Sequence, residues 1–208
     1  MSSITSPVTD VAPDIASFGA GGQMYMASIW SGFNVKSGQV INSLFAFSAN
    51  SSEENAAQLT NLMEARKVGS TMAFRANRLG IRFLWFVGSV PDLEALEQAK
   101  QLLASAVITL TVGSNETKVA EFSGLDLMQP IDAVAADATN TAAVTQGLGG
   151  GIGWIPLQVP IEIQANVNVG GTIRFTRSIG AKLLPASPTD PAVCGFVVTL
   201  QGLKVVKS

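Results

Sequence analysis

An alternating stretch over residues 160–177, with the sequence PIEIQANVNVGGTIRFTR, constrains the fold more than any other part of the chain. Apolar residues occupy every second position from Ile161 to Val169 and again at Ile173 and Phe175, with polar residues between them. A period of two is typical of strands that bury one face in a core. The pattern therefore predicts a β-sheet with one buried face and one face in water.

The glycine pair in the middle of this stretch predicts a β-hairpin, and the loop length decides its register. A two-residue glycine turn would leave the two apolar sets on opposite faces, because a slip of one residue turns every side chain over. A three-residue loop of residues 169–171 instead puts Val167 opposite Ile173. It also places Gly171 in the left-handed conformation that such loops need. We therefore predict a hairpin with the three-residue loop.

Further alternating runs predict an antiparallel β-sandwich or jelly roll of about eight to nine strands, with two short helices in its connections. Leucines at helical spacing follow acidic or capping residues in two places, and helices are predicted at 53–66 and 92–105. A change in the parity of the apolar positions at Gly202 predicts a β-bulge there. Besides the two strands of the 160–177 hairpin, we expect strands at 23–31, 39–48, 70–76, 79–88, 107–112, 116–122 and 194–206.

Two segments of unusual composition accompany this predicted domain. Residues 1–22 are rich in Ser, Thr, Pro, Ala and Gly, and they predict an extended N-terminal arm. Residues 126–156 are rich in Ala, Thr, Asn and Gly, and they predict one long loop. Loops of this length are uncommon in compact domains and are typical of binding, assembly or disorder. We therefore expect a single β-sandwich domain over residues 23–208 that carries this loop.

The composition favours a protein that neighbouring subunits cover. Apolar residues make up 47% of the chain and charged residues 13%, whereas about 25% is charged in an ordinary soluble domain. A monomer with a neutral polar surface is the alternative. Five bases and no acid lie in residues 66–82, whereas nine acids and two bases lie in residues 92–162. Such segregation suits head-to-tail contacts between copies, although solvated patches on a monomer explain it equally well.

The single cysteine, Cys194, and the lack of histidine limit the chemistry open to this sequence. No disulfide can form within the chain, and a zinc site of the usual kind lacks its ligands. A hydrolytic triad lacks its usual base. The glycine-rich residues 147–153 match no phosphate-binding motif, and Asp126, Asp132 and Asp137 match no calcium loop. We therefore expect no enzyme activity, no cofactor and no small-molecule substrate.

Neither a signal peptide nor a membrane span is expected from the sequence. No basic residue precedes Lys36, so the N-terminal region lacks the basic segment of a signal peptide. The uncharged residues 138–161 are long enough to cross a bilayer, but their glycines and prolines favour a loop.

Candidate interface residues come from two places in the sequence. Three arginines in residues 66–82 lie beside aromatic residues. Such an arrangement is typical of proteins that bind single-stranded nucleic acid, and it predicts a non-specific contact with the genome. The competing interpretation places the aromatic residues in a core and Arg78 in a turn. The polar face of the predicted hairpin is nearly neutral and therefore cheap to desolvate against another subunit. The candidates are Arg75, Arg78, Arg82, Trp154, Gln164, Asn166 and Asn168.

As a whole, the layout resembles that of the jelly-roll coat proteins of icosahedral viruses, including those of tailless bacterial viruses. The resemblance rests on the arm at 1–22, the helix at 92–105 leading into the hairpin at 107–122, and the terminal strand GFVVTLQGLKVV at 195–206. It implies a structural protein of the virion that assembles with copies of itself and with other virion proteins, and it carries over no catalytic residue. The alternative is a β-sandwich module for carbohydrate or receptor attachment, with an aromatic platform supplied by Tyr25, Trp30 or Trp154.

Overall fold

The computed structural model describes residues 22–87, 91, 93–127 and 153–207. The strands in these residues are β1 (Gly22–Val35), β2 (Ile41–Leu44), β3 (Met72–Trp85), β4 (Ala106–Val112), β5 (Thr117–Ser123), β6 (Gly153–Ile163), β7 (Val169–Phe175) and β8 (Cys194–Lys207). The helices in the same residues are α2 (Ala56–Leu59), α3 (Leu93–Ala104), α4 (Gly124–Leu127) and the 3-10 helix η1 (Ala181–Leu183).

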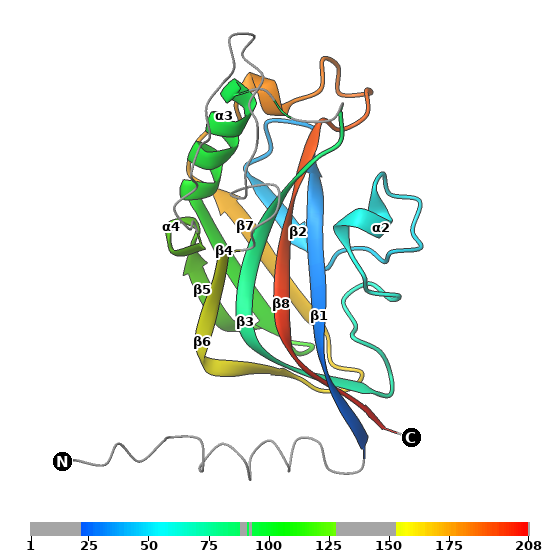
Figure 1. The fold of residues 1–208 in the computed structure, drawn as a ribbon. Coiled ribbons are helices and arrows are strands. Elements are labelled where there is room, and N and C mark those ends of the chain that lie inside the picture. The colour runs from blue at the N-terminus through cyan, green and yellow to red at the C-terminus, as the bar shows by residue number, and fades with distance from the viewer. Residues whose placement is uncertain (1–21, 88–90, 92, 128–152, 208) are drawn as a thin grey trace, which may run out of the picture.

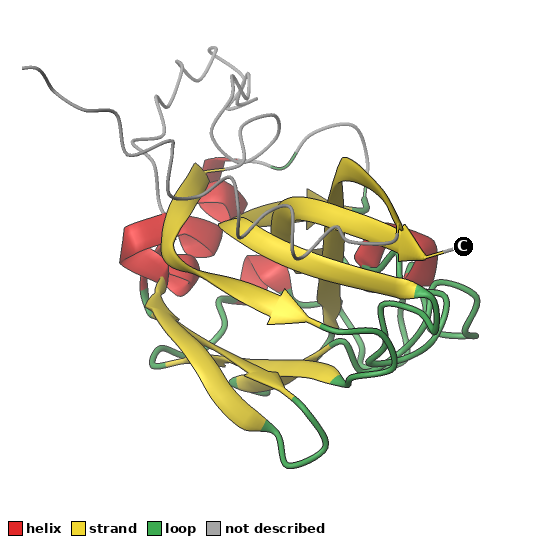
Figure 2. Cartoon of the chain, turned by 90° about the horizontal axis from the view of Figure 1, so that it is seen from below, coloured by secondary structure: helices red, strands yellow, loops and turns green. Residues whose placement is uncertain are grey.

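The strands form two four-stranded antiparallel sheets. Sheet A has the order β1-β8-β3-β6, and sheet B has the order β2-β7-β4-β5. Only the step from β4 to β5 stays within one sheet, since every other connection between consecutive strands joins one sheet to the other. Two packed sheets with this order make a jelly roll. The predicted all-β sandwich or jelly roll is confirmed, and its two layers can be followed in Figure 1 and Figure 2.

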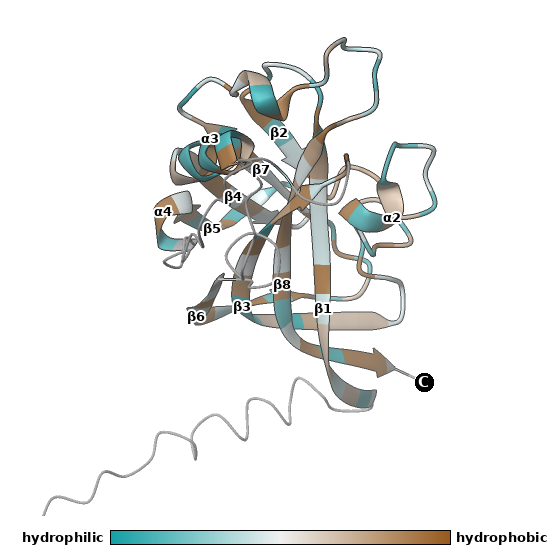
Figure 3. Ribbon diagram, turned by 45° about the horizontal axis from the view of Figure 1, so that its top comes forward, coloured by the Kyte–Doolittle hydropathy of each residue, from teal (hydrophilic) through white to brown (hydrophobic). Residues whose placement is uncertain are grey.

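The core lies between the sheets and is centred on four phenylalanines. Phe196 of β8 is fully buried. Its ring centroid lies 5.4 Å from that of Phe83, 5.7 Å from that of Phe175 and 6.1 Å from that of Phe33. Phe175 belongs to sheet B and the other three belong to sheet A, so this cluster joins the two layers. Figure 3 shows hydrophobic residues, coloured brown, along β3 and β8.

The prediction of a helix at 92–105 followed by a hairpin is confirmed by α3, β4 and β5. The buried side of α3 packs against the core through Ala95, Leu96, Ala99, Leu102 and Leu103. Glutamates and glutamine occupy the exposed side of the same helix, as its periodicity predicts. The chain then enters β4 at Ala106 and returns along β5 from Thr117.

The predicted β-bulge lies at the expected level of the sheet but in the neighbouring strand. β3 runs from Met72 to Trp85 as one strand, where the sequence predicted a strand pair. Its pairing with β8 passes from Ala76 opposite Gly202 to Arg78 opposite Gln201, so Asn77 is the extra residue. β1 pairs with β8 through Gly202 without irregularity. A change in which alternate positions are apolar shows that one strand has shifted by one residue relative to its neighbour. It does not show which of the two strands contains the extra residue.

The predicted hairpin over residues 160–177 is wrong. The first part of this stretch is the end of β6, which pairs with β3 in sheet A. The later part forms β7, which lies in sheet B between β2 and β4. The chain crosses between the sheets at residues 164–168, where Asn166 has a positive φ of 61°. Gly171 lies inside β7, and a Cβ atom there would lie 2.6 Å from the carbonyl oxygen of Thr109. Glycine therefore permits a close approach of strands, and the three-residue loop does not form.

Two further predictions need correction. The helix expected at 53–66 is only the four-residue α2, because Asn55 is left-handed (φ 59°) at its start and Thr60 is extended at its end. The bounds of the loop expected at 126–156 are wrong at both ends, since α4 covers residues 124–127 and β6 begins at Gly153. Residues 128–152 lie outside the described residues. The predicted arm at 1–22 also lies outside them, except for Gly22, which belongs to β1.

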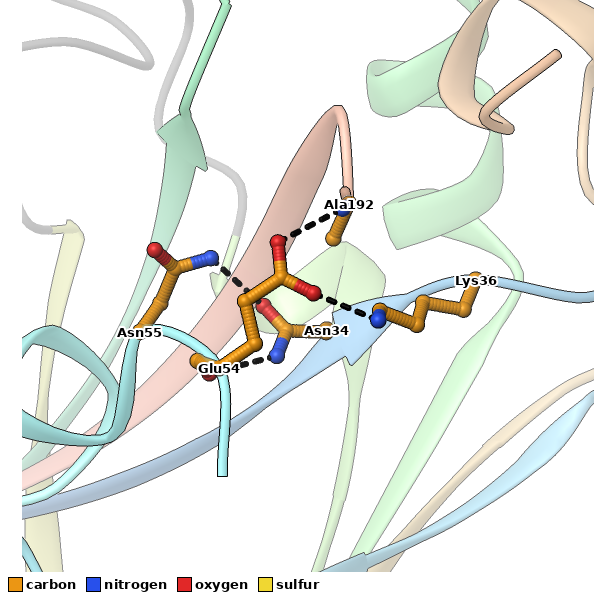
Figure 4. A network of polar contacts seen from close by, with 5 residues as sticks. All are labelled: Asn34, Lys36, Glu54, Asn55 and Ala192. Atoms are coloured by element: carbon orange, nitrogen blue, oxygen red, sulfur yellow. Dashed lines mark hydrogen bonds and ion pairs between the residues drawn. The ribbon is translucent and has the colours of Figure 1, made fainter. Parts of the chain in front are cut away.

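A network of polar contacts fastens the α2 segment to β1 and to the start of β8 (Figure 4). The carboxylate of Glu54 forms an ion pair with Lys36 and accepts a hydrogen bond of 2.8 Å from the backbone N–H of Ala192. The side-chain amide of Asn34 donates to the carbonyl oxygen of Glu54 at 2.6 Å. Asn55 donates in turn to the side-chain oxygen of Asn34 at 3.1 Å. Glu54 thus joins three separate parts of the chain.

The hydrogen bond with Lys36 is the largest cause that lowers the pKa of Glu54, and the hydrogen bond from Ala192 acts in the same direction. A carboxyl group whose pKa is lower in the folded state stabilises the fold above its unfolded pKa of about 4.3, and that contribution is lost as the pH falls through the folded pKa. We expect Glu54→Gln to lower the free energy of unfolding by about 1 kcal/mol at pH 7. We expect it also to remove part of the loss of stability on acidification below pH ~5.

Urea denaturation of both proteins between pH 3 and pH 7 measures this effect. The neighbouring exposed residue Glu53 supplies a control, since Glu53→Gln should retain the pH dependence of the natural sequence. Parallel stability–pH curves for Glu54→Gln and the natural sequence would contradict the role of Glu54.

Candidate functional site

Four of the candidate residues lie together on the outer face of sheet A. β3 carries Arg75, Arg78 and Arg82, and β6 carries Trp154. In a regular strand Arg75 would face the opposite side from the other two arginines, because successive side chains alternate. The extra residue Asn77 shifts this alternation, so that all three arginines point away from the core. We call this surface the arginine face. The turn that the competing interpretation placed at Arg78 does not form.

Strand pairing aligns residues across the arginine face in rows. One row consists of Trp30 of β1, Thr199 of β8, Gly80 of β3 and Trp154 of β6. Three strand spacings separate the two tryptophans, which places their backbones about 14 Å apart. Arg78 and Arg82 lie two residues on either side of Gly80 along β3, about 13 Å from each other. A tryptophan therefore ends the row on each side, and an arginine flanks its centre on each side.

The arginines differ in their surroundings. The Nε atom of Arg75 lies 3.6 Å from a carboxylate oxygen of Glu162, and its side chain is only 11% exposed. The guanidinium carbon of Arg82 lies 5.7 Å from the centre of the Trp30 ring, within the range of a cation–π contact. Burial lowers the pKa of Arg82. Among the described residues no carboxylate forms an ion pair with Arg78 or Arg82.

Three polar atoms around this cation–π contact are buried and have no hydrogen-bond partner in the part of the chain that the structure describes. They are Nε1 of Trp30, Nε of Arg82 and Oγ1 of Thr199. Thr199 is only 2% exposed and is the direct strand neighbour of Trp30. A buried polar group without a partner costs about 1–3 kcal/mol, and such groups are uncommon in folded proteins. The arginine face therefore contains donors that an acceptor from outside the described chain would satisfy.

The structure does not place the remaining candidates on the expected hairpin surface. Gln164, Asn166 and Asn168 lie in the crossover between β6 and β7, because the hairpin is not formed. Gln164 and Asn166 are exposed. The carbonyl oxygen of Asn168 accepts a 2.8 Å hydrogen bond from the backbone N–H of Gly113. The role of these residues in assembly stays a prediction.

Thr199 was not among the predicted interface residues, and Trp30 was named only for the aromatic platform of the alternative attachment module. Trp30 has the parity opposite to that of the core residues Ile29 and Phe33, and this alternation in the sequence is enough to place it on an outer face. No comparable signal exists for Thr199. Its burial depends on which strands lie beside β8, and the local sequence does not show this.

A second surface lies between the outermost strands of the two sheets. A groove of about 600 Å³ separates β5 from β6. The pairing of β6 with β3 jumps from Pro156 to Ile161, so residues 157–160 bulge out of the ladder. Val159 in this bulge is 79% exposed, more than any other large apolar residue among those described. Val119 of β5 is also exposed on the facing side of the groove.

Exposed apolar residues also occupy the opposite edge of sheet A. The edge of β1 is covered near Trp30, whose backbone N–H donates to the side chain of Asn61 at 2.9 Å and whose carbonyl oxygen accepts from Thr60 at 3.0 Å. No such cover is found for residues 22–27 among the described residues. This uncovered part of the edge strand exposes Met24, Tyr25 and Met26.

No model of a known protein family matches this sequence, and no curated protein is significantly similar to it. The strand order therefore defines the class: the chain is an all-β jelly-roll sandwich. In the part of the chain that the structure describes, no cluster of acidic or cysteine side chains is arranged to hold a metal ion. No helix there has both the length and the apolar character to cross a membrane.

Proposed function

We propose that this chain is a structural protein of a virion, which self-assembles into an icosahedral capsid shell or decorates one. The jelly roll supports this proposal, since viral capsid proteins are among the proteins that use it. Lectins and cupins use the same fold, so the fold alone does not select the function.

The observation that carries the proposal is the position of the exposed apolar side chains. Met24, Tyr25 and Met26 lie on β1, at one edge of sheet A, whereas Val159 lies on β6, at the other edge. Exposed apolar residues on an edge strand favour association with another chain. Two different apolar edges on opposite sides suit head-to-tail contacts, which build rings and larger closed assemblies when they repeat. The low content of charged residues, 13%, fits the same interpretation.

The β6 edge favours contacts between side chains over the addition of a strand. Pro156 and Pro160 remove two backbone N–H donors from this edge strand. Prolines on edge strands are a common device against uncontrolled sheet extension. We therefore expect Val159 to insert into an apolar surface of a neighbouring copy, with the groove beside β5 completing the contact.

Light scattering and negative-stain electron microscopy of the purified full chain test this proposal. We expect assemblies of uniform size that form as the concentration rises. Met26→Glu and Val159→Glu should each convert them to monomers, because a buried unpaired charge is costly. Val87→Glu adds the same charge at an exposed valine away from both edges and should leave assembly unchanged.

A protein that stays monomeric at every concentration would contradict the proposal. So would a Val87→Glu variant that prevents assembly as strongly as Val159→Glu. Glycan binding by a strictly monomeric protein, with loss on Tyr25→Ala, would instead support a carbohydrate-binding module.

A further inference from the structure

The arginine face carries a local excess of positive charge in a chain whose formal net charge is −2. The strand registers assign the outward positions of all four strands of sheet A. Among the described outward positions the three arginines face a single acid, Glu162, which lies beside Arg75. Arg78 and Arg82 lie further along β3, beyond that ion pair. Their charge is available to an anionic partner.

Aromatic side chains accompany these arginines on the same face. Trp154 is half-buried on the edge strand β6 and lies in the row between Arg78 and Arg82. Trp30 lies at the other end of the row, and the guanidinium of Arg82 forms a cation–π contact with its ring. Cationic and aromatic side chains that alternate along a sheet surface are a common way to bind single-stranded nucleic acid, with phosphates on the cations and bases stacked on the rings.

The unpartnered donors give a second and independent indication of a ligand. Within the described residues, Nε of Arg82, Nε1 of Trp30 and Oγ1 of Thr199 all lack acceptors, and Thr199 is almost completely buried. Each can donate a hydrogen bond, so the group that satisfies them must accept hydrogen bonds. A phosphate oxygen is such an acceptor, and its charge suits the unpaired guanidinium.

We propose that the arginine face binds single-stranded nucleic acid, with phosphate groups at Arg78 and Arg82 and a base stacked on Trp154. The contact is with the phosphate backbone and the base faces, so it has little dependence on base sequence. This binding is a property of one folded chain. The binding does not depend on self-assembly. A finding that the protein remains monomeric would therefore not contradict it.

Fluorescence anisotropy with a labelled oligothymidylate in low salt tests the proposal. Arg78 is exposed, so Arg78→Gln changes the charge without disturbing the core. We expect Arg78→Gln to weaken binding several-fold, and Arg78→Gln combined with Arg82→Gln to weaken it at least tenfold. Removal of one phosphate-binding arginine should lower the slope of log affinity against log salt by about 0.7. Far-UV circular dichroism establishes that the variants are folded.

Arg174 of β7 provides the matched control, because it is an exposed arginine on the other sheet. Arg174→Gln makes the same change in net charge and should bind oligothymidylate as the natural sequence does. Weakening of binding in this variant equal to that in Arg78→Gln would show a general charge effect and overturn the proposal. Absence of binding by the natural sequence in low salt would also overturn it.

Tryptophan fluorescence separates nucleic acid from other anions. A base stacked on Trp154 should quench the emission, and Trp154→Leu should remove part of this quenching and weaken binding. Tripolyphosphate has the phosphates but no base, so it should compete only weakly and cause no quenching. Equal affinity for tripolyphosphate would assign the face to a free oxyanion instead. Arginine variants that alter assembly but bind oligothymidylate normally would assign it to contacts between copies.

Discussion

Replacing Gly202 with alanine is expected to destabilise the protein by about 3 kcal/mol or more, or to prevent folding altogether. A Cβ atom at this position would lie 1.9 Å from the carbonyl oxygen of Arg75 and 2.8 Å from the Cα atom of Ala76. Both neighbours are backbone atoms of β3 beside its bulge, so no side chain can move aside. β3 and β8 would have to separate, which breaks the ladder at the centre of sheet A.

Urea denaturation followed by tryptophan fluorescence and far-UV circular dichroism measures this destabilisation. Gly38→Ala is the matched control, because no atom lies within 4 Å of its added Cβ and its φ is not in the left-handed region. That variant should remain within about 0.5 kcal/mol of the natural sequence. Similar denaturation midpoints for Gly202→Ala and the natural sequence would mean that β3 and β8 are not packed at the distance seen here.

Phe196→Ala is expected to cost about 3–5 kcal/mol, the usual range for removing a large aromatic side chain from a core. The ring is fully buried and contacts three other phenylalanine rings. Since one of these rings belongs to sheet B, its removal weakens the contact between the layers as well as the packing within sheet A. Thermal and urea denaturation measure the change.

Phe196→Leu keeps more of the buried volume and should cost less than Phe196→Ala. Met63→Ala removes a large apolar side chain that is 68% exposed, and it should change the stability by less than about 0.5 kcal/mol. We expect Met63→Ala to be the most stable of the three variants, Phe196→Leu the second and Phe196→Ala the least stable. Any other order would contradict the position of Phe196 at the centre of the core.

Local periodicity predicts which side chains face the core, and this part of the fold could be inferred from the sequence. Leu79, Ile81 and Phe83 share the core face of β3 as their alternation indicates. The helix α3 buries Leu96, Ala99 and Leu103 of the apolar stripe that its spacing predicts, whereas Leu93 at its start is exposed. The same periodicity contains no information about the partner strand. Residues 160–163 and 169–175 alternate alike, yet they belong to different sheets. A hairpin and a crossover therefore gave the same local pattern.

The candidate site shows a similar division. The arginines were recognised from their clustering in the sequence. Their position on a common face depends on the extra residue Asn77, and the sequence did not show that the bulge lies in β3. The contact of Arg82 with Trp30 joins strands far apart in the chain, as does the pairing of Trp30 with Thr199. Both follow from the neighbours of β8, which only the complete strand order provides.

The central position of β8 has a consequence for the order in which the fold can form. β8 lies between β1 and β3, so these two early strands have no direct pairing with each other. During synthesis, β1 must therefore wait until residues 194–207 have been made before it gains its long partner. Contacts between residues so distant in sequence close slowly, and chains with many of them fold in milliseconds to seconds. Sheet A is thus completed only after β8 has been made, and its apolar strands stay open to other chains until then.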